Sequence, residues 1–429
     1  MISAVKLLAV AAALGAALTA CAAARADAPD LRQPRPGMWR AWIETPGGPL
    51  PFGLEITPKP DGGLSAFMIN GPERLEFPIV QCADGQLTLR VDYYDSTITA
   101  RVVDDGAALE GEWSKRRSRD EVATIPFFAR ADQALRFDQI KPLRGVATAS
   151  SEQIGGRWRS TFAKDTDGAI GEFRIDDDGR ALATFLTPTG DYRYLEGVFD
   201  GSRLRLSCFD GAHAFLFDAS VQMNNGAVSL KGDFYSGAHW HDAWTAVRDP
   251  DASLPDAFTQ TAPTPNASLS TISFPDLDGR MRALDDPAFA GRARIIEVFG
   301  TWCPNCYDAT HLLKELHAKY SARGLAILGL AFEVTGDPER DSRQVRTYTD
   351  RMAIPWPILL AGRANKEEAS RALPIIDRLR SYPTFIFVDG AGRIRAVCTG
   401  FSGPATGEEH RKLRDRFEKL IESMLAEAN

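Results

Sequence analysis

Hydrophobic and polar positions divide the chain into two kinds of segment. From about residue 37 to residue 248, short runs alternate between apolar and polar residues, and Asp-Gly, Gly-Gly and Asn-Gly pairs separate them. Alternation with a period of two, broken at regular intervals by turn residues, predicts antiparallel strands and, most simply, closed barrels. From about residue 271 onward, apolar runs alternate with stretches whose apolar residues recur at helical spacing. This second part is expected to be α/β.

The second part predicts a definite order of elements. Strands are expected at Ala293–Phe299, Leu325–Phe332 and Trp356–Leu360, helices at Pro304–Tyr320, Glu339–Met352, Lys366–Arg380 and Gly407–Ala426, and a hairpin at Thr384–Val388 and Arg393–Cys398. A βαβ unit followed by a hairpin and a last helix is the thioredoxin topology.

Two cysteines with two residues between them stand where the first of these strands gives way to a helix. The motif is Trp302-Cys303-Pro304-Asn305-Cys306. This spacing and position predict a thiol–disulfide pair, because the unpaired amides and the dipole of a helix N-terminus favour thiolate over thiol. Cys303 is expected to be the attacking nucleophile and Cys306 the resolving thiol. Half of a zinc site is the weaker alternative, since no second CxxC or CxxH pair completes four ligands.

Two segments of this part match the motifs of a known family. They are Gly300-Thr301-Trp302-Cys303-Pro304-Asn305-Cys306 and Ser381-Tyr382-Pro383-Thr384-Phe385-Ile386-Phe387-Val388-Asp389. They resemble the TlpA/ResA-type thioredoxins, an exported and tethered branch of the thioredoxin superfamily. The resemblance implies a cis peptide bond before Pro383, facing the cysteines. It also implies substrate contacts from Trp302, Pro304, Tyr382 and Pro383.

Glu297 is an acidic residue in the middle of an apolar strand, six residues before Cys303. A carboxyl group there is expected to be buried with a raised pKa. In thioredoxins an acid at this spacing moves the proton of the resolving cysteine, so the resemblance assigns that role to Glu297. Many relatives place a glutamate three residues after the second cysteine; here that position is Ala309, with Asp308 beside it. The peroxiredoxin motif, with a threonine three residues before the cysteine, is absent because Gly300 precedes Cys303.

The N-terminus predicts export and lipid attachment. A short basic start and the apolar run of residues 7–18 fit a signal peptide over residues 1–20 and are too short for a spanning helix. Leu18-Thr19-Ala20-Cys21 resembles a bacterial lipobox, which implies lipidation of Cys21 and a flexible tether over residues 21–36. The expected location is the periplasmic side of a bacterial membrane. Ordinary cleavage after Ala26, giving a soluble periplasmic protein, is the alternative.

Composition limits the classes of partner that the protein is expected to bind. The net charge is −7, with 50 basic against 57 acidic residues, which argues against nucleic acid as a partner. Of the six cysteines, Cys82, Cys208 and Cys398 fall in predicted strands at no regular spacing. They are expected to be buried thiols, with a Cys82–Cys208 bridge as the alternative in an oxidising compartment.

The all-β part contains an internal duplication. Gly37-Met38-Trp39-Arg40 reappears as Gly156-Arg157-Trp158-Arg159, and two further segments repeat with the same offset of about 120 residues. The Gly-x-Trp openings, with Arg130 and Arg248 near the last strands, weakly resemble the lipocalin or calycin pattern, in which the arginine covers the tryptophan. The expected divisions are a barrel-like repeat at 37–131, a connector at 132–155, a second repeat at 156–248, a mobile Pro-rich linker at 249–270, and a thioredoxin-like domain at 271–429.

These features together predict a membrane-tethered thiol–disulfide oxidoreductase of the extracytoplasmic space, favoured as a disulfide reductase. Its partners would be protein or small-molecule disulfides and dithiols, together with an unidentified membrane electron donor. No cofactor is expected, and no metal, because metal binding by His213, His239 and His241 is a weaker interpretation than scattered surface or core histidines. The rival hypothesis is a binding lipoprotein whose β domains hold a small ligand or a protein partner, with the redox pair secondary.

Overall fold

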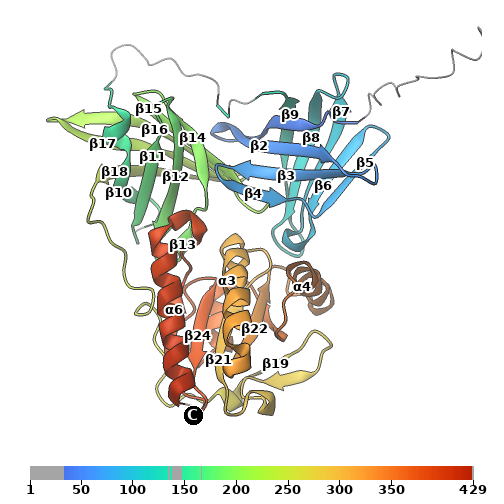
Figure 1. Cartoon of the computed structure of the whole chain (residues 1–429), viewed down its shortest axis with the longest axis vertical. Helices are drawn as coiled ribbons and strands as arrows, with labels where there is room; N and C mark the ends of the chain where they lie inside the picture. Colours follow the sequence, from blue (N-terminus) through green and yellow to red (C-terminus); the bar gives the residue numbers. More distant parts are fainter. Residues whose placement is uncertain (1–32, 134–135, 138–146, 166, 428–429) are drawn as a thin grey trace, which may run out of the picture.

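The computed structural model describes residues 33–133, 136–137, 147–165 and 167–427. Figure 1 shows two antiparallel β domains side by side, with an α/β domain packed beneath them. The predicted fold class is confirmed. The predicted signal peptide, the Cys21 lipidation site and most of the tether lie outside the described residues. Within the described ranges, no helix is long and apolar enough to cross a membrane.

The first β domain is an open sheet of nine strands in the order β4-β3-β2-β1-β9-β8-β7-β6-β5. Its elements are β1 (Gly37–Thr45), β2 (Gly48–Pro58), β3 (Leu64–Asn70), β4 (Glu73–Glu76), β5 (Ile79–Ala83), β6 (Gln86–Val91), η1 (Asp92–Tyr94), β7 (Ser96–Val103), β8 (Ala108–Arg116) and β9 (Val122–Ala131). This domain is barrel-like but not closed by strand pairing: β4 and β5 lie at opposite ends of the sheet, and the two residues Phe77-Pro78 that join them bring these ends together without a pairing between them.

The second β domain closes into a barrel. After the short helix α2 (Ser151–Ile154) come β10 (Gly156–Phe162), β11 (Ala169–Ile175), β12 (Arg180–Thr187), β13 (Gly190–Asp191), β14 (Leu195–Phe199), β15 (Arg203–Phe209), β16 (Ala214–Asn224), β17 (Ala227–Ser236) and β18 (Trp240–Arg248). The end strand β11 pairs with β12, which closes the sheet into a barrel and leaves the short β13 paired with β12 alone. Aromatic side chains such as Trp158, Phe185, Phe217 and Trp244 fill the interior.

The duplication is visible strand for strand, since each domain has nine strands and its first strand pairs with its last. Trp39 and Trp158 are both buried, and each indole N–H donates to a backbone carbonyl four residues earlier. The arginines do not cover them as the lipocalin pattern implied. Arg130 pairs with Asp104, and Arg248 donates to the carbonyls of Glu152 and Gln153.

The α/β domain has a five-stranded sheet in the order β23-β22-β21-β24-β25. Its elements are η2 (Leu269–Thr271), β19 (Ser273–Pro275), β20 (Met281–Ala283), η3 (Pro287–Phe289), β21 (Ala293–Phe299), α3 (Pro304–Tyr320), η4 (Ser321–Arg323), β22 (Leu325–Glu333), α4 (Pro338–Met352), β23 (Ile358–Arg363), α5 (Lys366–Ala372), β24 (Thr384–Val388), β25 (Ile394–Thr399), η5 (Pro404–Thr406) and α6 (Glu408–Glu427). The central strands β21, β22 and β24 are buried along their whole length, as their continuous apolar sequences predict.

Two predicted elements differ from the observed ones at prolines. The helix expected over Lys366–Arg380 ends at Ala372, because Pro374 lacks an amide hydrogen and disfavours helix in the residue before it. The strand expected at Trp356–Leu360 instead spans Ile358–Arg363 and begins after Pro357.

The Pro-rich segment 249–270 does not behave as the mobile linker that its composition suggested. Pro263 forms a β-bridge with Ile376, and the amide of Thr264 donates to the carbonyl of Ile375. Thr261 is buried and accepts a hydrogen bond from Thr399. Backbone and side-chain contacts therefore hold this segment against the α/β domain.

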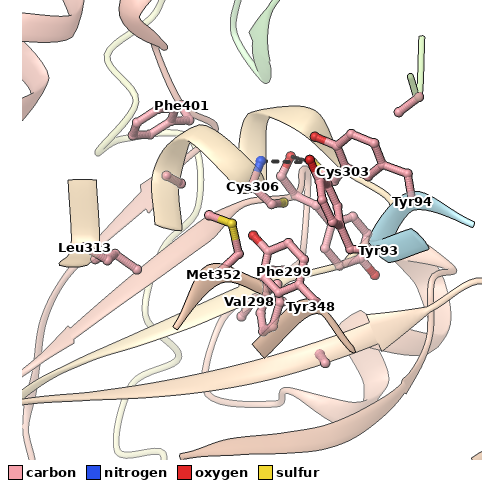
Figure 2. Packing of buried hydrophobic residues seen from close by; sticks show 14 of the residues in the cluster. Tyr93, Tyr94, Val298, Phe299, Cys303, Cys306, Leu313, Tyr348, Met352 and Phe401 are labelled. Atoms are coloured by element: carbon pink, nitrogen blue, oxygen red, sulfur yellow. Dashed lines mark hydrogen bonds between the residues drawn. The ribbon is translucent and has the colours of Figure 1, made fainter. Parts of the chain in front are cut away.

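The hydrophobic core runs without a break from the first β domain into the α/β domain. Figure 2 shows Tyr93 and Tyr94 from η1 beside Cys303, Cys306, Phe299 and Tyr348. The cysteine pair thus lies where separate parts of the chain meet, and residues outside the α/β domain contribute to its surroundings.

Candidate active site

The end of β21 and the start of α3 position the two cysteines. Cys303 is the N-cap of α3, and Pro304 occupies the first helical turn, where its missing amide costs no hydrogen bond. The amide of Cys306 donates to Sγ of Cys303 at 3.3 Å. Both are free thiols, with Cys303 7% exposed and Cys306 fully buried. The order of exposure is the predicted one, although the outer thiol is more covered than expected.

The two segments that carry the family resemblance meet in space. The Tyr382–Pro383 bond is cis, as predicted. The Cys303 thiol donates to the carbonyl of Tyr382 at 3.5 Å. The ring of Trp302 packs edge-on against Tyr382 at 5.4 Å, and its indole N–H donates to the carbonyl of Phe332 at 2.9 Å. The outer thiol therefore faces backbone that can pair with a substrate.

Glu297 lies in the middle of β21, between β22 and β24. Its side chain is 1% exposed, and Oε1 has no hydrogen-bond partner among the described residues. Burial raises the pKa of Glu297 well above its usual range, and negative charge on Cys303 raises it further. Burial also raises the pKa of the Cys306 thiol, with smaller contributions from Cys303 and Glu297. The predicted burial and pKa direction of Glu297 are confirmed.

Glu333, at the end of β22, stabilises the turn that leads to the cysteines. Its carboxyl oxygens accept from the amide of Thr301 at 2.9 Å and from the Thr301 hydroxyl at 2.8 Å. Burial raises the pKa of Glu333 to about 8, against the opposing effect of these hydrogen bonds. Its role in the geometry is to hold the turn.

Arg193, in the β13–β14 loop of the second β domain, is a residue that sequence reasoning missed. The side chain is 3% exposed and its guanidinium donates to the carbonyl of Pro304 at 3.0 Å and to Asp308 at 2.8 Å. It also pairs with Glu73 of the first β domain at 2.5 Å and with Asp210 at 3.7 Å. One arginine therefore joins all three domains at the start of α3.

The Arg193 cluster contains more acidic than basic groups. Burial raises the pKa of Asp308 to about 7, although Arg193 opposes the shift. Burial likewise raises the pKa of Glu73, again opposed by Arg193. The pKa of Asp210 is held well below its usual range despite burial, chiefly by His213. The cluster depends on Arg193 to compensate buried carboxylates.

The same loop contacts the active-site motif a second time. Asp191 accepts from the amide of Gly403 at 2.5 Å, and its carbonyl accepts from the Asn305 side chain at 3.3 Å. No local sequence pattern marks Asp191 or Arg193, because their partners lie more than 100 residues away in the chain.

The first β domain approaches from another side through η1. Tyr93 stacks on Tyr307 of α3 with ring centroids 5.7 Å apart. The Gln344 side chain donates to the carbonyls of Asp92 and Tyr93, and Arg351 pairs with Asp92 at 2.9 Å. These contacts hold α3 and α4 against the first β domain.

Among the histidines that the sequence singled out, His213 belongs to the Arg193 cluster because it pairs with Asp210, whereas His241 pairs with Asp233. The part of the chain that the structure describes holds no cluster of three metal-ligating side chains. Cys208 and Cys398 are buried free thiols, so the alternative of a Cys82–Cys208 bridge is not formed.

Comparison with known proteins identifies relatives of the last third of the chain. A model of the AhpC/TSA family matches residues 261–397. Thiol-disulfide oxidoreductase ResA of Geobacillus thermodenitrificans (strain NG80-2) is 25% identical over 144 residues, which is 33% of this chain and 74% of the relative. ResA of Geobacillus kaustophilus (strain HTA426) is 24% identical over 154 residues, 36% of this chain and 80% of the relative.

Among solved structures, a thioredoxin-family thiol:disulfide interchange protein from Chlorobium tepidum TLS is 22% identical. The match covers 38% of this chain and 97% of that protein, with a TM-score of 0.28. The sequence matches span the CxxC motif and the β21–α3–β22 unit that places it. The last third of this chain therefore has a thioredoxin-like fold and is similar in sequence to thiol-disulfide oxidoreductases named ResA.

Proposed function

We propose that this protein is a membrane-tethered thiol–disulfide oxidoreductase of the extracytoplasmic space that acts through Cys303 and Cys306. The observation that carries the proposal is the pair of thiols at the start of α3, with the amide of Cys306 3.3 Å from Sγ of Cys303. A helix N-terminus stabilises a thiolate through its free amides and its dipole. The names of the ResA relatives support the same activity.

The reaction begins with attack of the Cys303 thiolate on a substrate disulfide. The substrate S–S bond breaks, one substrate thiolate leaves, and a mixed disulfide forms on Cys303. The Cys306 thiolate then attacks Sγ of Cys303 and releases the second substrate thiol. Two electrons pass from the protein dithiol to the substrate, and the protein is left with a Cys303–Cys306 disulfide.

Glu297 moves the proton of Cys306 in this scheme. Negative charge on Cys303 helps to hold Glu297 protonated. That charge disappears when the mixed disulfide forms, which removes the smaller of the two causes of the raised pKa, burial being the larger. Glu297 then gives its proton to the departing substrate thiolate, and its carboxylate takes the proton of Cys306, which activates the resolving thiol at the step that needs it.

We favour the direction of disulfide reduction, by resemblance to the TlpA/ResA type. The electron donor would be a membrane carrier that reduces the Cys303–Cys306 disulfide back to the dithiol. The signal-like residues 1–20 and the lipobox cysteine Cys21 support export and a lipid anchor.

A binding lipoprotein is the rival function, and the packing of the second barrel weighs against it. Open polar interiors would favour ligand storage inside the β domains. The second barrel is instead filled by apolar rings, with Phe185 and Phe217 stacked at 4.6 Å. A barrel packed by its own side chains has no room for a ligand at its centre.

The test is the reduction potential of Cys303–Cys306 in the purified protein, equilibrated against glutathione and dithiothreitol. A potential near that of thioredoxin, about −270 mV, supports a reductase. A potential near −120 mV would make the protein an oxidant and reverse the proposed direction. The buried thiol variant Cys398→Ser should leave the couple unchanged, and absence of a reversible couple would return the function to the β domains.

A further inference from the structure

A cavity of about 570 Å³ lies between the mouth of the second barrel and the cysteine pair. Trp302, Cys303 and Tyr382 line it on the thioredoxin-like side. On the barrel side its walls combine polar residues with the rings of Phe162, Tyr192, Phe215, Phe234 and Trp240. A volume of this size falls within the range of small-molecule sites, about 300–1,000 Å³.

The barrel stands close to the thiol and limits the width of what reaches it. Gly190 packs so near to Asn305 that a Cβ at this position would lie 2.1 Å from the Asn305 amide nitrogen. Together with the Asp191 and Arg193 contacts, this closes one flank of the CxxC motif. We expect this flank to hinder the approach of a disulfide that lies on the face of a folded domain.

Charged groups of opposite sign line different parts of this cavity. Arg117 of the first β domain and Lys366 of α5 are exposed, and their charged ends have no ion-pair partner within the described part of the chain. Asp165 and Asp242 lie on the barrel side. Trp302 also borders a neighbouring cavity that Lys115 and Arg117 line, which extends the basic side.

Two buried polar atoms beside the cavity lack hydrogen-bond partners in the ranges that the structure describes. They are the hydroxyl of Tyr382, a residue 8% exposed, and Oδ1 of Asn305. Buried polar atoms are paired in the great majority of cases, so their absence of partners calls for an explanation. Amide groups of a bound substrate are of the right kind to pair with both.

We propose that this cavity is a binding site for a small, peptide-like, zwitterionic disulfide, and the proposal rests on the proposed redox function. Carboxylates of the substrate face Arg117 and Lys366, while its ammonium groups face Asp165 and Asp242. The Cys303 thiolate attacks one sulfur, and Cys306 releases the second product thiol. Two product thiols form as the protein becomes a disulfide, and an external dithiol such as dithiothreitol returns it to the reduced state.

The experiment measures the second-order rate at which three disulfides oxidise the reduced protein. The probes are glutathione disulfide, cystamine and insulin, which represent a zwitterionic peptide, a purely cationic disulfide and a folded protein. Each rate is divided by the rate of the same disulfide with dithiothreitol. Glutathione disulfide is expected to react at least tenfold faster than either of the others on this scale. Equal rates, or a faster reaction with insulin, would overturn the proposal.

Substitutions then test which side chains bind the carboxylates of the substrate. Arg117→Gln and Lys366→Gln should each lower the glutathione disulfide rate by about threefold, as expected for exposed ion pairs, and should not lower the rate with the cationic cystamine. Arg174→Gln, on an exposed arginine paired with Asp176, is the matched control and should change neither rate. Equal effects of the three substitutions contradict the assigned site.

A cavity-filling variant separates this proposal from the redox function itself. Ser236→Trp places a large ring in the cavity from β17, away from the CxxC motif. The glutathione disulfide rate should fall at least tenfold, while the reduction potential measured with dithiothreitol stays unchanged. An unchanged rate with an intact potential refutes the binding site alone, whereas a lost potential in the unsubstituted protein refutes the proposed function.

Discussion

The two β domains each have nine strands, with the first strand paired to the last, but they meet the thioredoxin-like domain through different chemistry. The first uses the loop between β6 and β7, where Tyr93 stacks on Tyr307 and Asp92 pairs with the partly exposed Arg351. The second uses Asp191 and Arg193, which bind the CxxC motif through buried polar contacts. The first copy packs against α3 and α4, and the second copy packs against the CxxC motif beside the reactive thiol.

This difference shows how a duplicated scaffold can acquire two roles through its loops. Stacked rings and exposed ion pairs tolerate the loss of one polar partner, since water replaces it. A buried network does not, because removal of one charge leaves the others uncompensated. The domains should therefore respond very differently to substitution at their contacts.

The largest effect is expected for Arg193→Met. This change leaves Asp308, Glu73 and Asp210 buried without their shared cation, which should lower the free energy of unfolding by about 3–5 kcal/mol. Urea unfolding measures it. The control is Arg74→Met, on an arginine of the first β domain that pairs with Glu55 at the surface, with an expected loss below about 1 kcal/mol. Similar losses in the two variants would remove the distinction between the domains.

Tyr93→Ala should have the next largest effect. It removes a buried ring that packs against Tyr307, Tyr94 and Tyr348 at the contact with the first β domain. A loss of about 3 kcal/mol in the free energy of unfolding is expected from the vacated volume. Tyr93→Phe keeps the ring and should retain most of the stability; if it is as damaging as alanine, the stacking account is wrong.

Glu333→Gln serves as a comparison within the thioredoxin-like domain, because Glu333 and its partner Thr301 both belong to that domain. The folded pKa of Glu333, about 8, is above its unfolded value, so the wild-type protein loses stability as pH rises from about 4.5 to 8. The variant should lack this loss, with a slope that differs by about 1.4 kcal/mol per pH unit. Unfolding midpoints across this pH range measure it, with the exposed Glu339→Gln as control. Parallel pH profiles for wild type and variant would rule out the shift.

The smallest effect is expected for Asp92→Asn. The Asp92 side chain is 10% exposed, but that of its partner Arg351 is 41% exposed, so water screens the ion pair and it should contribute about 1 kcal/mol. Urea unfolding at low and high salt measures this contribution, which salt should reduce. A loss comparable to that of Arg193→Met would mean that the contact made by η1 also depends on a buried charge network.

Local sequence pattern was sufficient for the strand and helix that carry the cysteines. The predicted bounds of β21 and α3 agree with the structure, because an unbroken apolar run and a proline at the first helical turn define them. Burial of Glu297 and the cis bond before Pro383 were also predicted correctly. Composition alone was a poorer guide. The Pro-rich segment was expected to be a mobile linker, but Pro263 pairs with Ile376 of the α/β domain.

The residues that complete the site could not be found in this way. Arg193, Asp191 and Tyr93 become part of it only when segments more than 100 residues apart are brought together. An arginine in a barrel loop resembles any surface cation until its buried partners are known. The duplication was visible in the sequence, whereas the different use of its two copies depends on how the domains pack.

The central claim is that Cys303 is the nucleophile and that substrate reaches it beside the second barrel. Glutathione disulfide added to a Cys306→Ser variant tests this directly, because the mixed disulfide cannot be resolved and stays on the protein. Mass spectrometry of peptides should find glutathione on Cys303, and Ser236→Trp in the same background should slow its appearance. Glutathione on Cys208 or Cys398 instead, or labelling of Cys303 that Ser236→Trp does not slow, would contradict the account.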